Sequence, residues 1–281
     1  MCSTKDIKTI LNTIRKDNLS GSGALLAGLL SGLSECTQKP GTYTAEELTL
    51  LPELFGQFKS DMADFAVISH FCDFILNSFK AESIQSSNDL QNIIERYRKD
   101  WQGVNSRIAD VFMRNVDIKG KTVLLHSQSS TIISLFEKLK NISESVNIIQ
   151  TESRPMYEGR LQAEKLAALG FNVKLVTDTG FTPLLDNIDL SILGADRIYS
   201  NVLINKTGSY AIGLLCREKN IPVYVLADSR KFIRTDKSAT ETLKTKPGSE
   251  IWSNPPRGIT PVNHYFEQVP LDVITKVITE K

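Results

Sequence analysis

The sequence has almost no excess of either charge. Its 281 residues include 33 Lys and Arg against 32 Asp and Glu, which gives a formal net charge of +1. Proteins that bind duplex nucleic acid by neutralising many phosphates usually carry a basic excess, and disordered chains have too few apolar residues to form a core. Since 41% of the residues are hydrophobic and 23% are charged, we expect a folded protein that does not bind nucleic acid directly.

Long apolar runs and clustered cysteines are also missing. The most apolar segment, residues 24–30, is far shorter than the ~20 residues that cross a bilayer, and charged residues interrupt the N-terminal segment where a secretory signal needs an apolar stretch. The four cysteines are Cys2, Cys36, Cys72 and Cys216. They have neither C-x-x-C spacing nor neighbouring histidines, so neither a disulfide framework nor a metal site is expected. These absences predict a cytoplasmic protein with reduced thiols and no membrane contact.

The first third of the sequence has helical periodicity. Apolar residues recur at spacings of three and four within residues 61–80, and shorter stripes of the same kind lie at 7–14 and 25–33. Turn-rich segments separate these stripes. We therefore expect residues 1–118 to form a helical N-terminal domain.

After Gly120 the pattern becomes that of an α/β protein. Short apolar, β-branched runs predict strands at 122–126, 146–151, 172–178, 190–194 and 222–227. Helical patterns lie between several of them, and such alternation is typical of a parallel sheet covered on both faces. Residues 119–281 are thus predicted to form a Rossmann-like C-terminal domain with a mainly parallel sheet. No glycine fingerprint follows a strand, so no dinucleotide or other cofactor is expected.

Polar and basic residues follow the predicted strands. They occur in the runs 126–130, 151–154, 177–180, 194–197 and 227–231. The carboxyl ends of parallel strands form the ligand crevice of such a sheet. Each run alone is commonly a helix cap. The five together favour an anionic ligand, because basic residues accompany them at Arg154, Arg160, Lys206, Arg230 and Lys231. We expect a locally cationic site that the total charge of +1 conceals.

Three further segments bear on this site. Gly21, Ser22 and Gly23 precede an apolar helix and could present free N–H groups to a phosphate, although an ordinary N-cap loop is the commoner use of such a segment. Lys206, in the run 205–208, could meet a phosphate or lie in a surface turn. Residues 229–256 are expected to form a mobile loop near the site, with Trp252 and the two prolines after it as candidate anchors.

Several short motifs occur in a characteristic order from about residue 120 onward. They are Thr151–Pro155, Glu158–Arg160, Gly194–Ile198, Asn201, Asn205–Gly208, Lys231–Phe232 and Ile278–Glu280. Together they resemble the eukaryotic initiation factor 2B alpha/beta/delta family, whose superfamily also contains methylthioribose-1-phosphate and ribose-1,5-bisphosphate isomerases. The resemblance implies a sugar-phosphate pocket between a helical and a Rossmann-like domain, and homodimerisation mainly through the latter. By family analogy only, it also implies initiation-factor partners.

The resemblance also assigns roles to single residues. The isomerases bind phosphate with the N-terminal glycine loop, here Gly21–Gly23, and with the arginine of the E-S-R-P run, here Arg154. They pair a cysteine after the first Rossmann strand with the aspartate of the G-A-D run, here Asp196, but Ser127 stands at the position of the cysteine. A thiol titrates near neutral pH, with a pKa of about 8.5, whereas a serine hydroxyl needs an activating base. His126 is not assigned this role, because the sequence does not show in which direction its side chain points.

Two functions therefore stay open. The preferred hypothesis is an initiation-factor-2B-like regulatory protein that binds a sugar phosphate or nucleotide monophosphate without turning it over. The alternative is an aldose–ketose sugar-phosphate isomerase that uses Asp196, itself equally well explained as a cap, with Ser127 or water in place of the thiol. In both cases the predicted ligand-binding residues are Gly21, Ser22, Gly23, Ser129, Arg154, Arg160, Asn205 and Lys206.

Overall fold

The computed structural model describes residues 2–17, 20–140, 146–233 and 243–281. The chain divides into two compact units, Met1–Val104 and Asn105–Lys281, and each is described by itself. The division falls after Val104, the first residue of helix α6 (Val104–Asn115), whereas the sequence predicts a boundary after residue 118. In the structure Phe112 of α6 packs edge-on against the ring of Tyr224 in the second unit. Helical periodicity alone does not show which unit such a helix joins.

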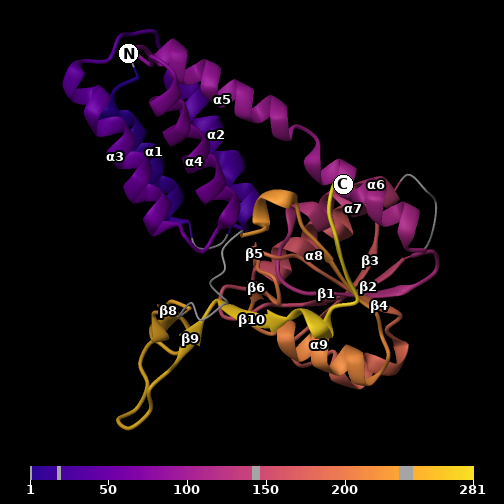
Figure 1. Ribbon diagram of the computed structural model, residues 1–281. Coiled ribbons are helices and arrows are strands. Elements are labelled where there is room, and N and C mark those ends of the chain that lie inside the picture. The colour runs from indigo at the N-terminus through magenta and orange to yellow at the C-terminus, as the bar shows by residue number, and fades with distance from the viewer. Residues whose placement is uncertain (1, 18–19, 141–145, 234–242) are drawn as a thin grey trace. The chain divides into compact units, whose positions relative to one another are not determined.

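The first unit is helical. Its described helices are α1 (Thr4–Lys16), α2 (Ser22–Thr37), α3 (Ala45–Asp61), α4 (Ala66–Ala81) and α5 (Ser87–Trp101) (Figure 1). Capping boxes formed by Ser3, Thr44 and Ser86 begin α1, α3 and α5. The apolar stripe predicted at 61–80 lies on α4, which begins later than predicted because Phe65 is extended at its N-cap.

The prediction of four reduced thiols is wrong for two of them. Cys2 and Cys36 form a disulfide, with their Cα atoms 5.0 Å apart. Cys36 lies near the end of α2, Cys2 directly precedes Ser3, the N-cap of α1, and these two helices contact each other. The pairing depends on helix packing across 34 positions, so it leaves no trace in cysteine spacing. Cys72 and Cys216 are free and buried.

The second unit contains a six-stranded parallel sheet in the order β11-β7-β4-β1-β2-β3. Its strands are β1 (Thr122–Leu125), β2 (Asn147–Thr151), β3 (Asn172–Val176), β4 (Leu190–Leu193), β7 (Val223–Leu226) and β11 (Lys276–Ile278). Helices α7 (Ser130–Leu139) and α8 (Glu158–Ala168) cover one face, and α9 (Ser209–Glu218) covers the other (Figure 1), as right-handed crossovers require. The predicted fold class, a helical region followed by a Rossmann-like parallel sheet, is confirmed.

A smaller antiparallel sheet accompanies the parallel one. Its strands are β5 (Arg197–Ile198), β6 (Val202–Lys206) and β10 (Phe266–Pro270), with β6 in the middle. Short 3-10 helices complete the unit at η1 (Thr182–Asn187), η2 (Ser229–Lys231), η3 (Gly248–Glu250) and η4 (Leu271–Val273). All five residues of β6 are buried, so Asn205 and Lys206 belong to a core strand and not to a surface turn.

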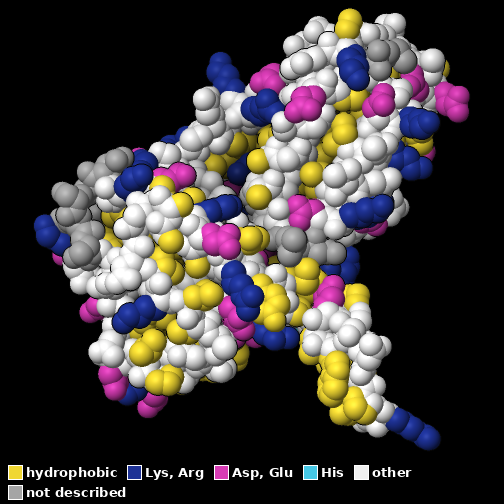
Figure 2. All heavy atoms as spheres, turned by 180° about the vertical axis from the view of Figure 1, so that it is seen from behind, with side chains coloured by type: hydrophobic (Ala, Val, Ile, Leu, Met, Phe, Trp, Pro, Cys, Tyr) yellow, Lys and Arg dark blue, Asp and Glu magenta, His cyan; other side chains and the backbone are white. Residues whose placement is uncertain are grey.

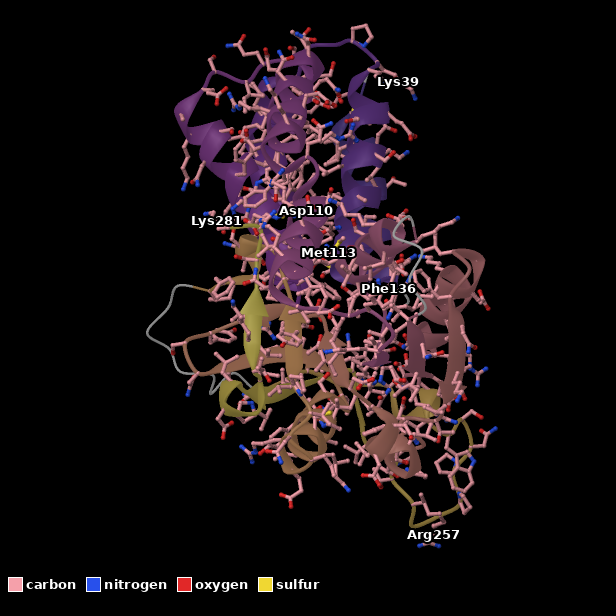
Figure 3. The ribbon with its side chains drawn as sticks, turned by 90° about the vertical axis from the view of Figure 1, so that its right-hand side faces the viewer. Lys39, Asp110, Met113, Phe136, Arg257 and Lys281 are labelled. Atoms are coloured by element: carbon pink, nitrogen blue, oxygen red, sulfur yellow. A yellow bond between two sulfur atoms is a disulfide. The ribbon has the colours of Figure 1, made fainter. Side chains whose placement is uncertain are left out.

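A hairpin projects from the second unit. Strands β8 (Thr245–Lys246) and β9 (Asn263–His264) pair at its base (Figure 1), and Arg257 lies at its tip (Figure 3). We call residues 245–264 the arm. Apolar side chains gather along it (Figure 2), and those more than one-third exposed are Ile251, Trp252, Ile259 and Val262. Trp252 is 46% exposed, and its role as an anchor stays a prediction. Residues 234–242 of the predicted loop lie outside the described residues.

None of the described helices is both long and apolar enough to cross a bilayer. Within the described ranges, no three His, Cys, Asp or Glu side chains are placed to hold a metal ion.

Candidate functional site

The parallel register places five loops along one edge of the large sheet. Leu125 at the end of β1 is opposite Gln150 of β2 and Ile192 of β4, and Thr151 is opposite Val176 of β3. The residues that follow these strands are therefore neighbours. We call them the carboxyl edge, which comprises residues 126–129, 151–160, 177–180, 194–197 and 227–231 together with the adjoining 205–208.

Ser127 occupies an unusual backbone position at this edge. Its φ of 62° lies in the left-handed region, which is uncommon for residues other than glycine. The backbone N–H of Ser127 donates to Oγ of Ser153 at 2.8 Å, and Ser153 has the same φ. The Oγ of Ser127 donates to Oε1 of Glu158 at 3.2 Å. Ser127, which the resemblance predicts at the position of the family cysteine, is thus hydrogen-bonded to a carboxylate.

Glu158 also forms a buried ion pair. Its Oε1 lies 2.8 Å from Nζ of Lys206, and only 11% and 4% of the two side chains are exposed. Oε2 of Glu158 is buried without a hydrogen-bond partner among the described atoms. We call Ser127, Glu158 and Lys206 the acidic corner. It places a carboxylate between the serine hydroxyl and the lysine ammonium.

Gly159 allows α8 to begin at this place. A Cβ on Gly159 would lie 2.0 Å from the carbonyl oxygen of Thr151, so only glycine lets the first turn of α8 lie directly against the end of β2. Glu158 is then held in the first turn, where the helix dipole favours a carboxylate.

His126 is buried and tied on both ring nitrogens. Nε2 lies 2.9 Å from the carbonyl oxygen of Thr207, and Nδ1 lies 2.5 Å from Oγ1 of Thr151. Since a carbonyl only accepts, Nε2 carries the proton and Nδ1 accepts from the threonine hydroxyl. Burial lowers the pKa of His126 to about 4, against the opposing effect of Asp178. The imidazole is therefore neutral at pH 7 and has no lone pair left to act as a base.

Arg154 is anchored through its backbone and leaves its side chain exposed. The N–H groups of Ser153 and Arg154 both donate to the carboxylate of Asp178, each at 2.7 Å. The guanidinium lies over the ring of Tyr157 at 5.2 Å. Among the described residues it has no carboxylate partner. Arg154 thus offers a guanidinium that an anion can approach.

The other basic groups of the carboxyl edge are largely neutralised. Arg160, Lys206 and Arg230 pair with Glu152, Glu158 and Asp228 at 2.7, 2.8 and 2.9 Å. Burial opposes ionisation of Asp228, but hydrogen bonds and charge from Arg230 outweigh it and hold the pKa of Asp228 below its usual value. Lys231 is buried and donates to the carbonyl of Ala195. Acids from the same loops thus match three of the cations, so the site is less cationic than the sequence indicates.

Three other predicted site residues, Ser129, Asn205 and Asp196, also lie in the second unit. Ser129 caps α7 and lies near Gly194, whose added Cβ would be 3.3 Å from its Oγ. Asn205 donates to Oγ of Ser209 at 2.8 Å. Asp196 is half-buried beyond the end of β4. All three belong to the second unit, together with Ser127, Arg154, Arg160 and Lys206. Their roles toward a ligand stay predictions.

Gly21–Gly23 belong to the other unit. Gly21 is the N-cap of α2, and no side chain caps that helix. The first N–H groups of α2 are therefore not used by a side-chain cap, as an anion site requires. A role for this segment in phosphate binding stays a prediction.

Sequence reasoning did not identify three features of the candidate site. Glu158 was visible only as part of a motif and had no assigned partner. Two buried amides, Gln150 and Gln162, connect β2 and α8 to the 127–129 loop, because Gln162 accepts from the N–H of Ser129 and donates to Gln150. Glu267 accepts from the N–H groups of Gly208 and Tyr210 at 2.7 and 2.8 Å. A carboxylate thus already occupies the start of α9, where the sequence suggested phosphate contact.

Similar proteins fall into two functional groups. Ribose 1,5-bisphosphate isomerase of Archaeoglobus fulgidus is 29% identical over 209 residues, which are 72% of this chain and 66% of that protein. A putative translation initiation factor eIF-2B subunit 2-like protein of Pyrococcus abyssi is 32% identical over 162 residues, 57% of this chain and 56% of that protein. The matches thus span less than two-thirds of the length of these relatives.

Solved structures share the fold. The translation initiation factor eIF-2B of Pyrococcus horikoshii superposes with a TM-score of 0.80 at 22% identity, covering 98% of this chain and 94% of that one. The 5-methylthioribose 1-phosphate isomerase of the same organism gives a TM-score of 0.77 at 18% identity, with 98% and 83% covered. Residues 19–281 match the sequence profile of the Initiation factor 2 subunit family. Since that match covers both units nearly in full, the chain belongs to the Initiation factor 2 subunit family.

Proposed function

We propose that this chain binds a phosphorylated sugar or a nucleotide monophosphate at the carboxyl edge and does not turn it over. The observation that carries the proposal is the guanidinium of Arg154. It is exposed beside Tyr157, its backbone is fixed by Asp178, and no described carboxylate neutralises it. A planar guanidinium with free donors suits a phosphate monoester.

The state of the neighbouring groups supports binding without catalysis. An aldose–ketose interconversion moves hydrogen between two adjacent carbons and needs groups that exchange protons near neutral pH. Ser127 is no such group, and its hydroxyl is engaged by Glu158. His126 is neutral, and both of its nitrogens are hydrogen-bonded. Of the residues proposed for catalysis, Asp196 alone keeps a titratable side chain.

Ligand-induced stabilisation tests the proposal. A ligand present at about 100 times its Kd adds about 2.7 kcal/mol to the free energy of unfolding, so ribose 5-phosphate or AMP should raise the Tm of the protein. We expect Arg154→Ala to abolish the rise. Arg257→Ala, at the exposed tip of the arm, removes an equal charge and should leave the rise intact. A rise that persists in Arg154→Ala would overturn the assigned site.

A second function is favoured by the acidic corner. Glu158 accepts the hydroxyl proton of Ser127 in a hydrogen bond, so a carboxylate stands where an activating base would be needed, and one relative is named ribose 1,5-bisphosphate isomerase. Incubation with ribose 1,5-bisphosphate and with methylthioribose 1-phosphate, followed by detection of the ketose, separates the two functions. Turnover that disappears in Asp196→Asn would establish the isomerase function and contradict the proposal that the chain binds its ligand without turning it over.

We also propose that the chain forms a homodimer through its second unit. The apolar side chains exposed on the arm support this, since such patches commonly mark interfaces. A solved structure with the same fold is that of the tetrameric eIF2B-beta2-delta2 complex from C. thermophilum. Association with initiation factors is supported by the names of relatives alone, and a pulldown with initiation factor 2 tests it.

A further inference from the structure

The pairing of charges at the carboxyl edge bears on how many phosphates the second unit can accept. This inference rests on the proposed function. Three of the six basic residues of the carboxyl edge pair with acids from the same loops, and Arg197 is buried. Lys231 is buried, with its ammonium on the carbonyl of Ala195. Arg154 remains as the accessible cation without an acidic partner among the described residues.

The pairs differ in how easily an incoming phosphate could open them. Arg160 is half exposed in its pair with Glu152, and a surface pair of this kind contributes little. Lys206 is 4% exposed in its pair with Glu158, and its ammonium also lies 5.2 Å from the centre of the Tyr265 ring. Separating that buried pair would leave two uncompensated charges, which is strongly unfavourable.

The second carboxylate oxygen of Glu158 adds to the cost of bringing a phosphate close to Lys206. Oε2 is buried and has no hydrogen-bond donor in the described structure, so Lys206 and Ser127 compensate the carboxylate through Oε1 alone. A phosphate that approaches Lys206 would meet this carboxylate at close range. Like charges placed together in a partly dry site repel strongly.

We infer that Glu158 is a specificity-determining residue. It keeps a second phosphate away from Lys206, so that the second unit accepts a sugar monophosphate in preference to a bisphosphate. Arg154 takes the single phosphate, and an uncharged part of the ligand faces the acidic corner. Lys206 then acts through its pair with Glu158 and not as a phosphate anchor.

Calorimetric titration with ribose 5-phosphate and with ribose 1,5-bisphosphate tests the inference. The quantity compared is the ratio of the bisphosphate affinity to the monophosphate affinity. In the wild type we expect this ratio to be one or less. Glu158→Gln frees the charge of Lys206 and should raise the ratio roughly tenfold. The control is Glu164→Gln, which makes the same charge change at an exposed position on the same helix and should leave the ratio unchanged.

A double variant keeps the test decisive if Glu158→Gln fails to fold. Glu158→Gln with Lys206→Met removes both charges together, a replacement that buried pairs commonly tolerate. We expect its affinity ratio to equal that of the wild type, because no cation is gained or lost. A roughly tenfold fall in the ratio would identify Lys206 as a phosphate anchor and overturn the inference.

The remaining outcomes separate the inference from the proposed function. A wild type that binds the bisphosphate at least tenfold more tightly than the monophosphate overturns the inference and leaves the proposed function standing. An equal gain in Glu164→Gln overturns it as well, because a general change of charge would then explain the effect. If neither ligand binds, both proposals fail.

Discussion

At the scale of single residues, the contact between Gly159 and Thr151 decides where the acidic corner lies. α8 can start against the end of β2 only because position 159 has no side chain. The prediction that Ser127 replaces the family cysteine rests on the order of motifs along the chain alone and stays a prediction. The hydrogen bond between Ser127 and Glu158 could not be predicted from the sequence, because it depends on how closely α8 packs against the end of β2.

Gly159→Ala should destabilise the protein by about 2 to 4 kcal/mol, because the new methyl group would lie 2.0 Å from the Thr151 carbonyl. Urea denaturation measures the change in the free energy of unfolding. Gly56→Ala is the matched control, since a Cβ there meets no atom within 4 Å in helix α3, and it should be neutral or stabilising by up to about 1 kcal/mol. Equal effects of the two substitutions would contradict the close approach.

His126 should make stability depend on pH in the mildly acidic range. The pKa of His126 is about 4 in the folded protein against 6.5 in its reference state, so the unfolded chain binds the extra proton first as the pH falls. Stability is therefore fully present above pH 6.5 and is lost as the pH falls towards 4. Between about pH 7.5 and about pH 5 we expect a loss of about 2 kcal/mol. His126→Gln should lack this component, and an imidazole NMR signal of His126 that titrates near pH 6.5 would contradict the assignment.

At the scale of secondary structure, helices and strands with a clear hydrophobic pattern are predictable from the sequence, whereas very short strands and their pairing are not. The five predicted strands are β1, β2, β3, β4 and β7, and the helical patterns expected between several of them correspond to helices such as α8. β11 was missed because it has three residues, too few for a periodic signal. The antiparallel sheet is not predictable from these patterns, because β6 is followed at once by a turn and α9. Residues 205–208 therefore resemble a turn before a helix.

The disulfide between Cys2 and Cys36 should stabilise the helical unit. Closing a loop with a sequence separation of 34 stabilises a folded chain by up to about 4 kcal/mol through the lost entropy of the unfolded state. A reductant should therefore lower the Tm of the wild type. The variant with Cys2→Ala and Cys36→Ala should melt at the lower temperature with or without reductant. Four free thiols in intact-mass analysis without reductant would contradict the pairing.

At the scale of the whole molecule, the arm is the proposed surface for self-association. Four large hydrophobic side chains on the arm are more than one-third exposed, and Val262 reaches 67%. Exposed apolar patches of this kind are commonly covered by a partner. Composition could not locate this surface, because the arm residues are spread through a segment whose polar residues predicted a loop.

Charged substitutions on the arm should lower the oligomeric state. We expect Trp252→Glu with Ile259→Glu to convert the proposed dimer to a monomer, measured by light scattering after size exclusion. The control is Leu50→Glu, which changes an exposed apolar side chain of α3 in the other unit and should leave the mass unchanged. A wild-type monomer, or a dimer that survives both arm substitutions, would remove the arm from the proposed interface.

The pairing of β11 with β7 has a consequence for biosynthesis. About fifty positions separate these neighbouring strands, and the arm and β10 lie between them. While the ribosome is still making that segment, β7 is an open border of the sheet, and such unpaired borders are vulnerable to aggregation. The helical unit precedes it and closes mostly local contacts, so it can fold while translation continues. A nascent chain stalled before Lys276 should therefore engage chaperones at β7.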